Sequence, residues 1–338
     1  MKRFFAVLVL ISAFIMACGT SNESAKLEKG TPAYDLAKAV SEKVPYMNPD
    51  KNNVLVKTNN FAVTTAEVFH TIQSNYGNRA SQLQNLDSAR IAGIIEGNAR
   101  QIAEKKLLLS AVQKSNMTAS SAEIDSVMNL QYMRAGGKTA FLKMIESNGV
   151  DTNYIKTQIS EGVTIQKFLD NKLGEETKVT EDDIQKAYNE DKTATVRHIL
   201  LSTQGKSDSA KQEIRKNMED ILARARKGED FAKLAKEYSE DPGSKDKGGL
   251  YENFGRGQMV KPFEDAAFSV PVGQISDIIE TQYGFHILKV IDRKKESKPL
   301  EEVRAQLEEK IKRTKQQEAY QTYMDGLKDK VGFKEIEF

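Results

Sequence analysis

The sequence predicts an α+β protein, rich in long helices, that also contains a small antiparallel sheet. Three observations support this fold class. Apolar residues recur at helical spacing through most of the chain, and helix-capping sequences precede several of these stretches. A short apolar segment of strand character, residues 196–201, interrupts the helical pattern. At 338 residues the chain is long enough for two domains that each bury a core.

The composition narrows the function classes. Charged residues make up 29% of the sequence and tryptophan is absent, which suits long solvated helices better than a large compact enzyme core. Lys and Arg total 50 against 48 Asp and Glu, giving a formal net charge of +2. Such a balance creates no global field that would recruit nucleic acid or an anionic membrane. We therefore expect no nucleic-acid partner.

The first residues predict export. Lys2 and Arg3 precede an apolar run that ends at Ala17 and is too short for a permanent membrane span, so residues 1–17 read as a signal peptide. The junction Ile15-Met16-Ala17-Cys18-Gly19 resembles a bacterial lipobox. That resemblance implies a lipid on Cys18, which is the only cysteine in the sequence and has no partner for a disulfide.

The alternative is ordinary signal cleavage with a cysteine nearby by chance, since Met16 is an unusual lipobox residue. A lipid on Cys18 would hold the chain at a membrane of the cell envelope. The surface would be the outer face of the plasma membrane or the periplasmic face of an outer membrane. Residues 18–31, rich in Ser, Glu, Lys and Gly, read as a flexible tether.

Residues 32–192 predict a mostly helical region. Residues 53–63 read as a short strand pair that turns at Asn59-Asn60, and a helix follows. Capping boxes begin at Thr64 and Ser120. Further helical stretches are expected at about 88–114, from 120, and at 141–147, 152–173 and 180–188. No cluster of catalytic residue types and no fixed repeat occurs there. At the other end we expect a charged helix over 299–330 and a strand over 331–338.

Several linked motifs lie between residues 193 and 293. The strand Val196–Leu201 carries His198, and helices are expected over 207–226 and 231–238. Four short sequences then follow: Tyr-Ser-Glu-Asp ending at Asp241, Gln-Met before Pro-Phe-Glu at 258–264, Val-Gly-Gln-Ile-Ser at 272–276 and Tyr-Gly-Phe-His-Ile at 283–287. In this order and spacing they resemble a parvulin-type peptidyl-prolyl cis/trans isomerase. The resemblance implies a small antiparallel sheet flanked by helices.

The same resemblance implies a set of site residues. Leu250, Met259 and Phe263 match the apolar pocket that grips the substrate proline. His198 and His286 match two stacked histidines beneath that pocket. Asp241 stands where members of the family carry Cys or Asp, and Thr281 and Tyr283 lie in the run facing it. The plainer alternative is that the apolar residues and both histidines are ordinary core residues.

The flanking segments resemble the PrsA and SurA family of exported foldases in pattern and order. In those proteins the carboxy-terminal helix returns to pack on the amino-terminal helices. We therefore expect residues 32–192 and 294–338 to form one chaperone-like helical domain, with the isomerase domain of residues 193–293 inserted into it.

The predicted function is a lipid-anchored isomerase that assists the folding of exported proteins, with unfolded or partly folded exported polypeptides as partners. The alternative is an ATP-independent holdase whose isomerase-like domain has little or no activity. A purely structural lipoprotein has no support beyond the anchor. The helical region is a candidate surface for a homodimer.

The sequence predicts no phosphate requirement, no cofactor and no metal. The loop after His198 offers a lone lysine, Lys206, instead of a basic cluster, so we expect no phosphate requirement. We expect no cofactor and no metal, because three scattered histidines and one modified cysteine leave no zinc set.

Overall fold

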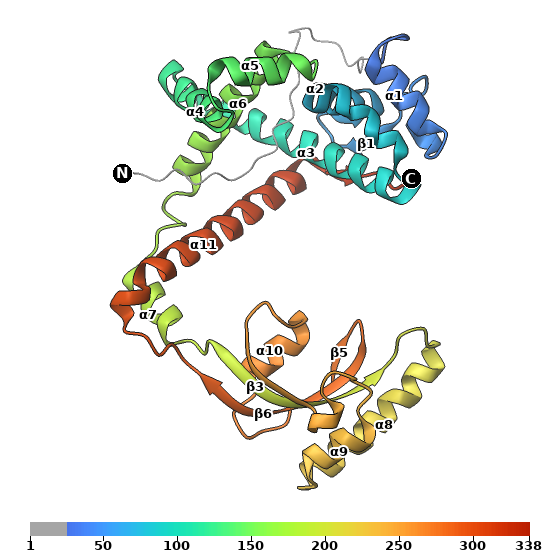
Figure 1. Ribbon diagram of the computed structural model, residues 1–338, viewed down its shortest axis with the longest axis vertical. Helices are drawn as coiled ribbons and strands as arrows, with labels where there is room; N and C mark the ends of the chain where they lie inside the picture. The colour runs from blue at the N-terminus through green and yellow to red at the C-terminus, as the bar shows by residue number, and fades with distance from the viewer. Residues whose placement is uncertain (1–25) are drawn as a thin grey trace. The chain divides into compact units, whose positions relative to one another are not determined.

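The computed structural model describes residues 26–338. The signal peptide, Cys18 and the first part of the tether therefore lie outside the described residues. The described chain divides into two compact units (Figure 1). Unit 1 combines the described residues up to Lys178 with Thr314–Phe338, and unit 2 is Val179–Arg313. Within residues 26–338, no helix combines the length and the apolar character needed to cross a membrane.

Unit 1 is helical apart from one small sheet. Its helices are α1 (Pro32–Ser41), α2 (Thr65–Tyr76), α3 (Ser88–Ser115), α4 (Ser121–Arg134), α5 (Lys138–Ser147) and α6 (Thr152–Leu173), with 3₁₀ helices at Pro45–Met47 and Gly77–Asn85. Strands β1 (Val54–Lys57), β2 (Ala62–Thr64) and β7 (Lys334–Glu335) form a sheet in the order β2-β1-β7. The expected strand pair and the helix over 88–114 are confirmed.

Caps and apolar faces explain these helices. The Ser120 hydroxyl accepts from the Glu123 backbone N–H at 3.3 Å while the Glu123 carboxylate accepts from the Ser120 N–H at 2.7 Å, so the predicted capping box starts α4. α3 buries Ile91, Ile95 and Ile102 on one face, in an apolar cluster that also includes residues of α2, β1 and β2. α4, α5 and α6 form a separate apolar cluster around Phe141 and Ile159.

The carboxy-terminal helix α11 (Leu300–Val331) contributes its later part to unit 1. Met324 is buried there against Leu107 and Leu108 of α3. The strand expected over 331–338 is wrong in extent, because Val331 is still helical and only Lys334–Glu335 pair with β1. The chain turns at Gly332, whose φ of +60° suits glycine.

Unit 2 is built on one antiparallel sheet. Its strands are β3 (Thr193–Ser202), β4 (Leu250–Gly255), β5 (Ile279–Thr281) and β6 (Gly284–Lys294), in the order β4-β3-β6-β5. Its helices are α7 (Glu181–Asn189), α8 (Asp208–Arg226), α9 (Phe231–Tyr238), α10 (Lys261–Ser269) and the first part of α11, with a 3₁₀ helix at Lys245–Lys247. This unit is longer at both ends than the segment 193–293 expected for the isomerase domain.

Both faces of this sheet are covered. Ile199, Phe285 and Ile287 pack against α8 and α9 on one face. Val196, Leu288 and Val290 pack against α10 on the other face, and Figure 1 shows α10 on the opposite side from α8 and α9. α10 is not among the sequence predictions, although Pro262 in its first turn and an apolar pair four residues apart, Phe263 and Ala267, are typical of a helix.

Candidate active site

Strand register brings the two histidines of unit 2 together. His198 on β3 pairs with Leu288 of β6, and Leu200 pairs with His286. Paired residues share one face of a sheet, so the histidines are diagonal neighbours on the α10 face. Their rings are stacked, with centroids 5.7 Å apart and planes 18° apart, and their Nδ1 atoms lie 3.5 Å apart. Both side chains are almost fully buried, at 3% and 4% exposure.

The Tyr-Ser-Glu-Asp sequence places Asp241 beside this pair. The buried Ser239 hydroxyl at the end of α9 accepts from the Leu200 N–H at 3.2 Å, and the Glu240 N–H donates to the Leu200 carbonyl at 2.7 Å. These contacts hold the chain against β3. The Asp241 Oδ2 then lies 3.0 Å from His198 Nε2.

Two further side chains contact the Asp241 carboxylate, and the sequence analysis did not predict either of them. The Ser244 hydroxyl donates to Asp241 Oδ2 and lies 2.8 Å from His198 Nε2. The Tyr251 hydroxyl donates to the same Oδ2 at 3.1 Å. Ser244 follows Asp241 by one turn, and Tyr251 stands directly after Leu250 on a strand. The alternation of side chains along a strand distinguishes the tyrosine from Leu250 only once β4 is recognised as a strand.

A close backbone contact fixes the loop that carries Ser244. The Gly249 carbonyl accepts from the His198 N–H at 2.8 Å, and Gly249 N–H donates to the Ser244 carbonyl at 2.8 Å. Gly249 has φ +74°, and a Cβ there would lie 2.1 Å from the His198 carbonyl oxygen. Only glycine allows the loop to come this close to β3.

The contacts assign tautomers when both rings are neutral. The Asp241 carboxylate only accepts, so His198 Nε2 carries its proton and His198 Nδ1 accepts. His286 Nδ1 is then the donor between the rings, and His286 Nε2 accepts from the Thr281 hydroxyl at 2.8 Å. The Thr281 oxygen in turn accepts from the Tyr283 N–H at 3.1 Å. In this assignment each contact has one donor and one acceptor.

Burial and hydrogen bonding set the charges in this network. Burial, together with the nearby His198, lowers the pKa of His286 from 6.5 to about 4, so the His286 ring is neutral at pH 7. The hydrogen bond from His198 holds the pKa of Asp241 well below its usual value, against the effect of burial, with Ser244 and Tyr251 contributing. Burial, together with the Asp241 charge, raises the pKa of Tyr251 to about 12, so its hydroxyl stays a donor.

An apolar wall lies directly on this network. The buried Phe263 ring of α10 meets both histidines edge-on, 5.3 Å from the His198 centroid and 5.6 Å from that of His286. Met259 packs half-buried in the same apolar cluster, and so does Tyr251. Leu250 pairs with Arg197 of β3, whereas Tyr251 pairs with Val196. Register therefore puts Leu250 on the opposite face of the sheet from Phe263.

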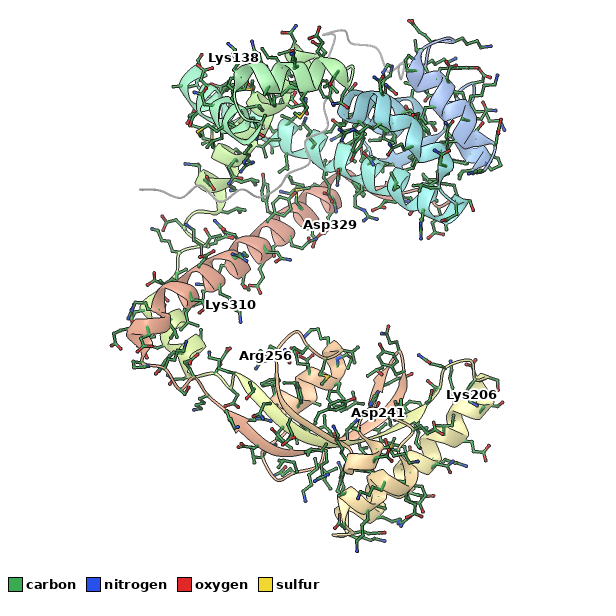
Figure 2. All side chains as sticks on the ribbon, in the orientation of Figure 1. Lys138, Lys206, Asp241, Arg256, Lys310 and Asp329 are labelled. Carbon is green, nitrogen blue, oxygen red and sulfur yellow. The ribbon has the colours of Figure 1, made fainter. Side chains whose placement is uncertain are left out.

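Thr281 and Tyr283, the other predicted site residues, contact the histidine network in different ways. Thr281 belongs to the network through its hydroxyl. Tyr283 joins it through its backbone N–H, while its side chain is 43% exposed. Lys206 lies in the loop between β3 and α8, away from Asp241 (Figure 2). In the part of the chain that the structure describes, no group of three or more His, Cys, Asp or Glu is arranged to hold a metal ion.

Comparisons with known proteins identify the family and several relatives. The family model for the PPIC-type peptidyl-prolyl isomerase domain matches residues 178–294. The foldase protein PrsA of Geobacillus sp. (strain WCH70) is 31% identical over 270 residues, which cover 79% of this chain and 82% of that protein. The foldase protein PrsA of Clostridium botulinum (strain ATCC 19397 / Type A) is 27% identical over 339 residues, covering 94% and 93%. A crystal structure of the peptidylprolyl isomerase PrsA from Bacillus cereus is similar with a TM-score of 0.41 and 28% identity, covering 82% of this chain and 92% of that one.

The low pKa of His286 makes stability depend on pH in a defined window. Between pH 6.5 and about 4 the unfolded chain binds a proton at this residue and the folded chain does not. We expect the free energy of unfolding to fall as the pH is lowered through this window. An NMR titration of the His286 ring should show a midpoint near 4, and denaturation of a His286→Gln variant should show a weaker pH dependence. A midpoint near 6.5 would contradict the burial argument.

Proposed function

The chain belongs to the PrsA foldase family and is a peptidyl-prolyl isomerase, and we propose that it acts without covalent chemistry on exported polypeptides while anchored to a membrane through Cys18. Its substrates on this proposal are X-Pro bonds in unfolded or partly folded chains. The roles of the site residues below are part of the same proposal.

The reaction defines what the site must supply. Rotation about an X-Pro bond has a barrier of roughly 18–20 kcal/mol, because resonance makes the C–N bond partly double. A thousandfold acceleration requires about 4 kcal/mol of stabilisation that is specific to the twisted amide. The twisted amide has a less polar carbonyl than the planar one. An apolar wall that grips the proline ring therefore favours the twisted form.

The observation that carries the proposal is the stacked histidine pair beneath Phe263. Each ring is almost fully buried, and each Nε2 is already engaged, with Asp241 and Ser244 in one case and Thr281 in the other. Rings enclosed in this way are poorly placed to attack a substrate. We assign them, with Asp241, to holding Phe263 and the apolar wall in position. The carboxylate at 241 also leaves no thiol for a covalent step.

Substrate selection follows from the loop after β3. Its lone lysine, Lys206, offers one point charge, whereas recognition of a phosphorylated side chain relies on several basic groups. We propose that phosphorylation of the residue before proline is not required.

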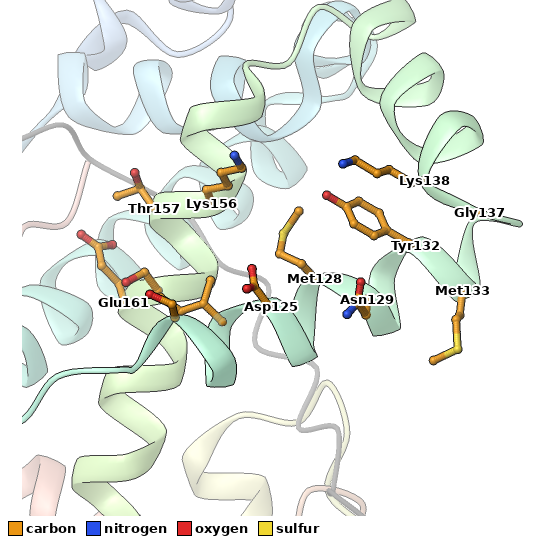
Figure 3. A pocket seen from close by; sticks show the side chains of 13 residues that line it. Asp125, Met128, Asn129, Tyr132, Met133, Gly137, Lys138, Lys156, Thr157 and Glu161 are labelled. Atoms are coloured by element: carbon orange, nitrogen blue, oxygen red, sulfur yellow. The ribbon is translucent and has the colours of Figure 1, made fainter.

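Unit 1 offers a second candidate function, holdase binding, supported by a groove. The groove lies between α4, the start of α5 and α6, with a volume of about 1140 Å³ (Figure 3). Met128, Tyr132 and Met133 line it, and Met133 is 68% exposed. Methionine adapts to many apolar shapes, and exposed apolar patches mark interaction sites. We propose that an extended segment of an unfolded client lies here.

Truncating the apolar wall should slow catalysis more than it weakens folding. We expect Met259→Ala to lower kcat/KM on an Ala-Pro peptide about tenfold, or about 1.4 kcal/mol, because the half-buried side chain supports the proline ring. Met218→Ala is the matched control. It removes a fully buried methionine on the other face, so it should lower stability and leave kcat/KM of the folded protein unchanged. Equal effects of the two variants on kcat/KM would contradict the assignment.

The groove can be tested with two exposed methionines. Met133→Asp places a charge in the groove, while Met144→Asp places one at a residue that is 48% exposed and does not line it. We expect the first variant to suppress aggregation of an unfolded client several-fold less well than the second. The isomerase rate on a short peptide should be unchanged in both. Equal suppression would argue against the groove as the binding surface.

The anchor can be tested in cells. We expect Cys18→Ser to abolish incorporation of labelled palmitate and to move the protein from the membrane fraction to the soluble fraction. Membrane retention with the label still incorporated would count against lipidation at Cys18.

A further inference from the structure

Tyr251 belongs to both halves of the site. We propose that this residue couples the apolar wall to the Asp241–His198 pair, acting as a substrate-contacting and positioning residue for the isomerase reaction. The proposal rests on the proposed function of unit 2. It assigns to Tyr251 the place in the wall that sequence reasoning gave to Leu250.

The ring of Tyr251 is part of the apolar wall. It packs in the cluster that holds Met259 and Phe263, and its centroid is 5.2 Å from that of His198 with the planes 36° apart. The residue is half-buried, so part of its surface remains open to a ligand. An aromatic ring at such a place supplies a large rigid contact area for a proline ring.

Strand geometry excludes Leu250 from the same wall. Neighbouring residues on a strand point to opposite faces. Tyr251 pairs with Val196, on the face that Phe263 covers, and Leu250 pairs with Arg197 on the other face. Tyr251 is therefore the residue of this pair that can meet a substrate bound against Phe263.

The hydroxyl of Tyr251 connects the wall to the carboxylate. It donates to Asp241 Oδ2 at 3.1 Å, and this same oxygen faces His198 Nε2 at 3.0 Å. The chain leaves room for the contact: a Cβ on Gly243 would lie 2.9 Å from the Tyr251 oxygen. The high pKa of Tyr251 keeps its proton on at any physiological pH.

A ligand that presses on the ring thus acts on the orientation of the carboxylate, and through it on the tautomer of His198. Asp241 holds that imidazole beneath Phe263. The hydroxyl of Tyr251 orients the Asp241 carboxylate, and the ring of Tyr251 contacts the substrate. The two roles predict different kinetic effects.

Two substitutions in the full-length protein separate the roles. Tyr251→Phe keeps the ring and removes the hydroxyl, so kcat on an Ala-Pro peptide should fall about fivefold with little change in KM. The ¹⁵N signal of His198 Nε2 should shift as well. Tyr251→Leu removes both groups, so it should also raise KM several-fold.

Tyr238→Phe is the matched control. The Tyr238 hydroxyl also contacts a side chain, Arg224, at 2.9 Å, but this tyrosine packs on the α8 and α9 face. The control should leave kcat, KM and the His198 signal unchanged. Gly243→Ala gives an independent perturbation, because its methyl group displaces the Tyr251 hydroxyl. It should reproduce the kcat loss of Tyr251→Phe, and it serves as the test if the Tyr251 variants do not fold.

The outcomes are distinguishable. Wild-type kinetics and an unmoved His198 signal in Tyr251→Phe, or in Gly243→Ala, would overturn the proposal and leave the proposed isomerase mechanism standing. A loss of stability alone, with normal kcat, would make Tyr251 a packing residue and would also overturn it. Failure of the wild-type protein to accelerate exchange would instead overturn the proposed function.

Discussion

The contact between His198 Nε2 and Asp241 Oδ2 is the interaction on which the rest of the site depends. It joins the central strand β3 to the loop after α9, which also carries Ser244 and leads to β4. Breaking it would remove the direct contact between a nearly buried imidazole and a mostly buried carboxylate and leave Ser244 as the side chain that still bridges them. The contact therefore stabilises the position of the loop after α9 against β3. The loop in turn brings Tyr251 to the apolar wall and holds the His198 ring beneath Phe263.

The two faces of the unit 2 sheet differ in the side chains that they carry. The face covered by α8 and α9 is an ordinary apolar core, with Ile199, Phe285 and Ile287 fully or almost fully buried. The face covered by α10 contains the polar network, and α10 places the Phe263 ring against both of its histidines. Alternation of side chains along β3 and β6 thus keeps the polar network on the α10 face, beside a second apolar cluster that contains Val196, Leu288 and Val290. A site built on the central strands of a sheet is held more rigidly than one built on loops alone.

Much of this could be predicted from the sequence, and the misses have physical causes. A short stretch of sequence is enough to predict a helix with a capping box, such as α4. The same holds for the apolar strand that carries His198. The stacking of His198 on His286 depends on the register of β3 and β6. In the sequence, only the linked motifs of the parvulin resemblance suggested it. Leu250 and Tyr251 could not be told apart because strand β4 was not predicted, so its alternation could not be applied. The strand expected over 331–338 is too long, since Val331 is still helical and strand β7 covers only Lys334–Glu335. Ser244 offers no signal without the fold.

Asp241 and Thr281 hold the two histidines in one fixed hydrogen-bonded arrangement, with Nε2 of His198 facing Asp241 and Nε2 of His286 facing Thr281. Long-range ¹H–¹⁵N NMR of the full-length protein, labelled in its histidine rings, tests this most directly at pH 7. We predict a proton on Nε2 of His198, where it faces Asp241, and a single proton on the His286 ring. No proton on Nε2 of His198, rapid averaging of tautomers at His286, or two protons on the His286 ring would contradict this arrangement.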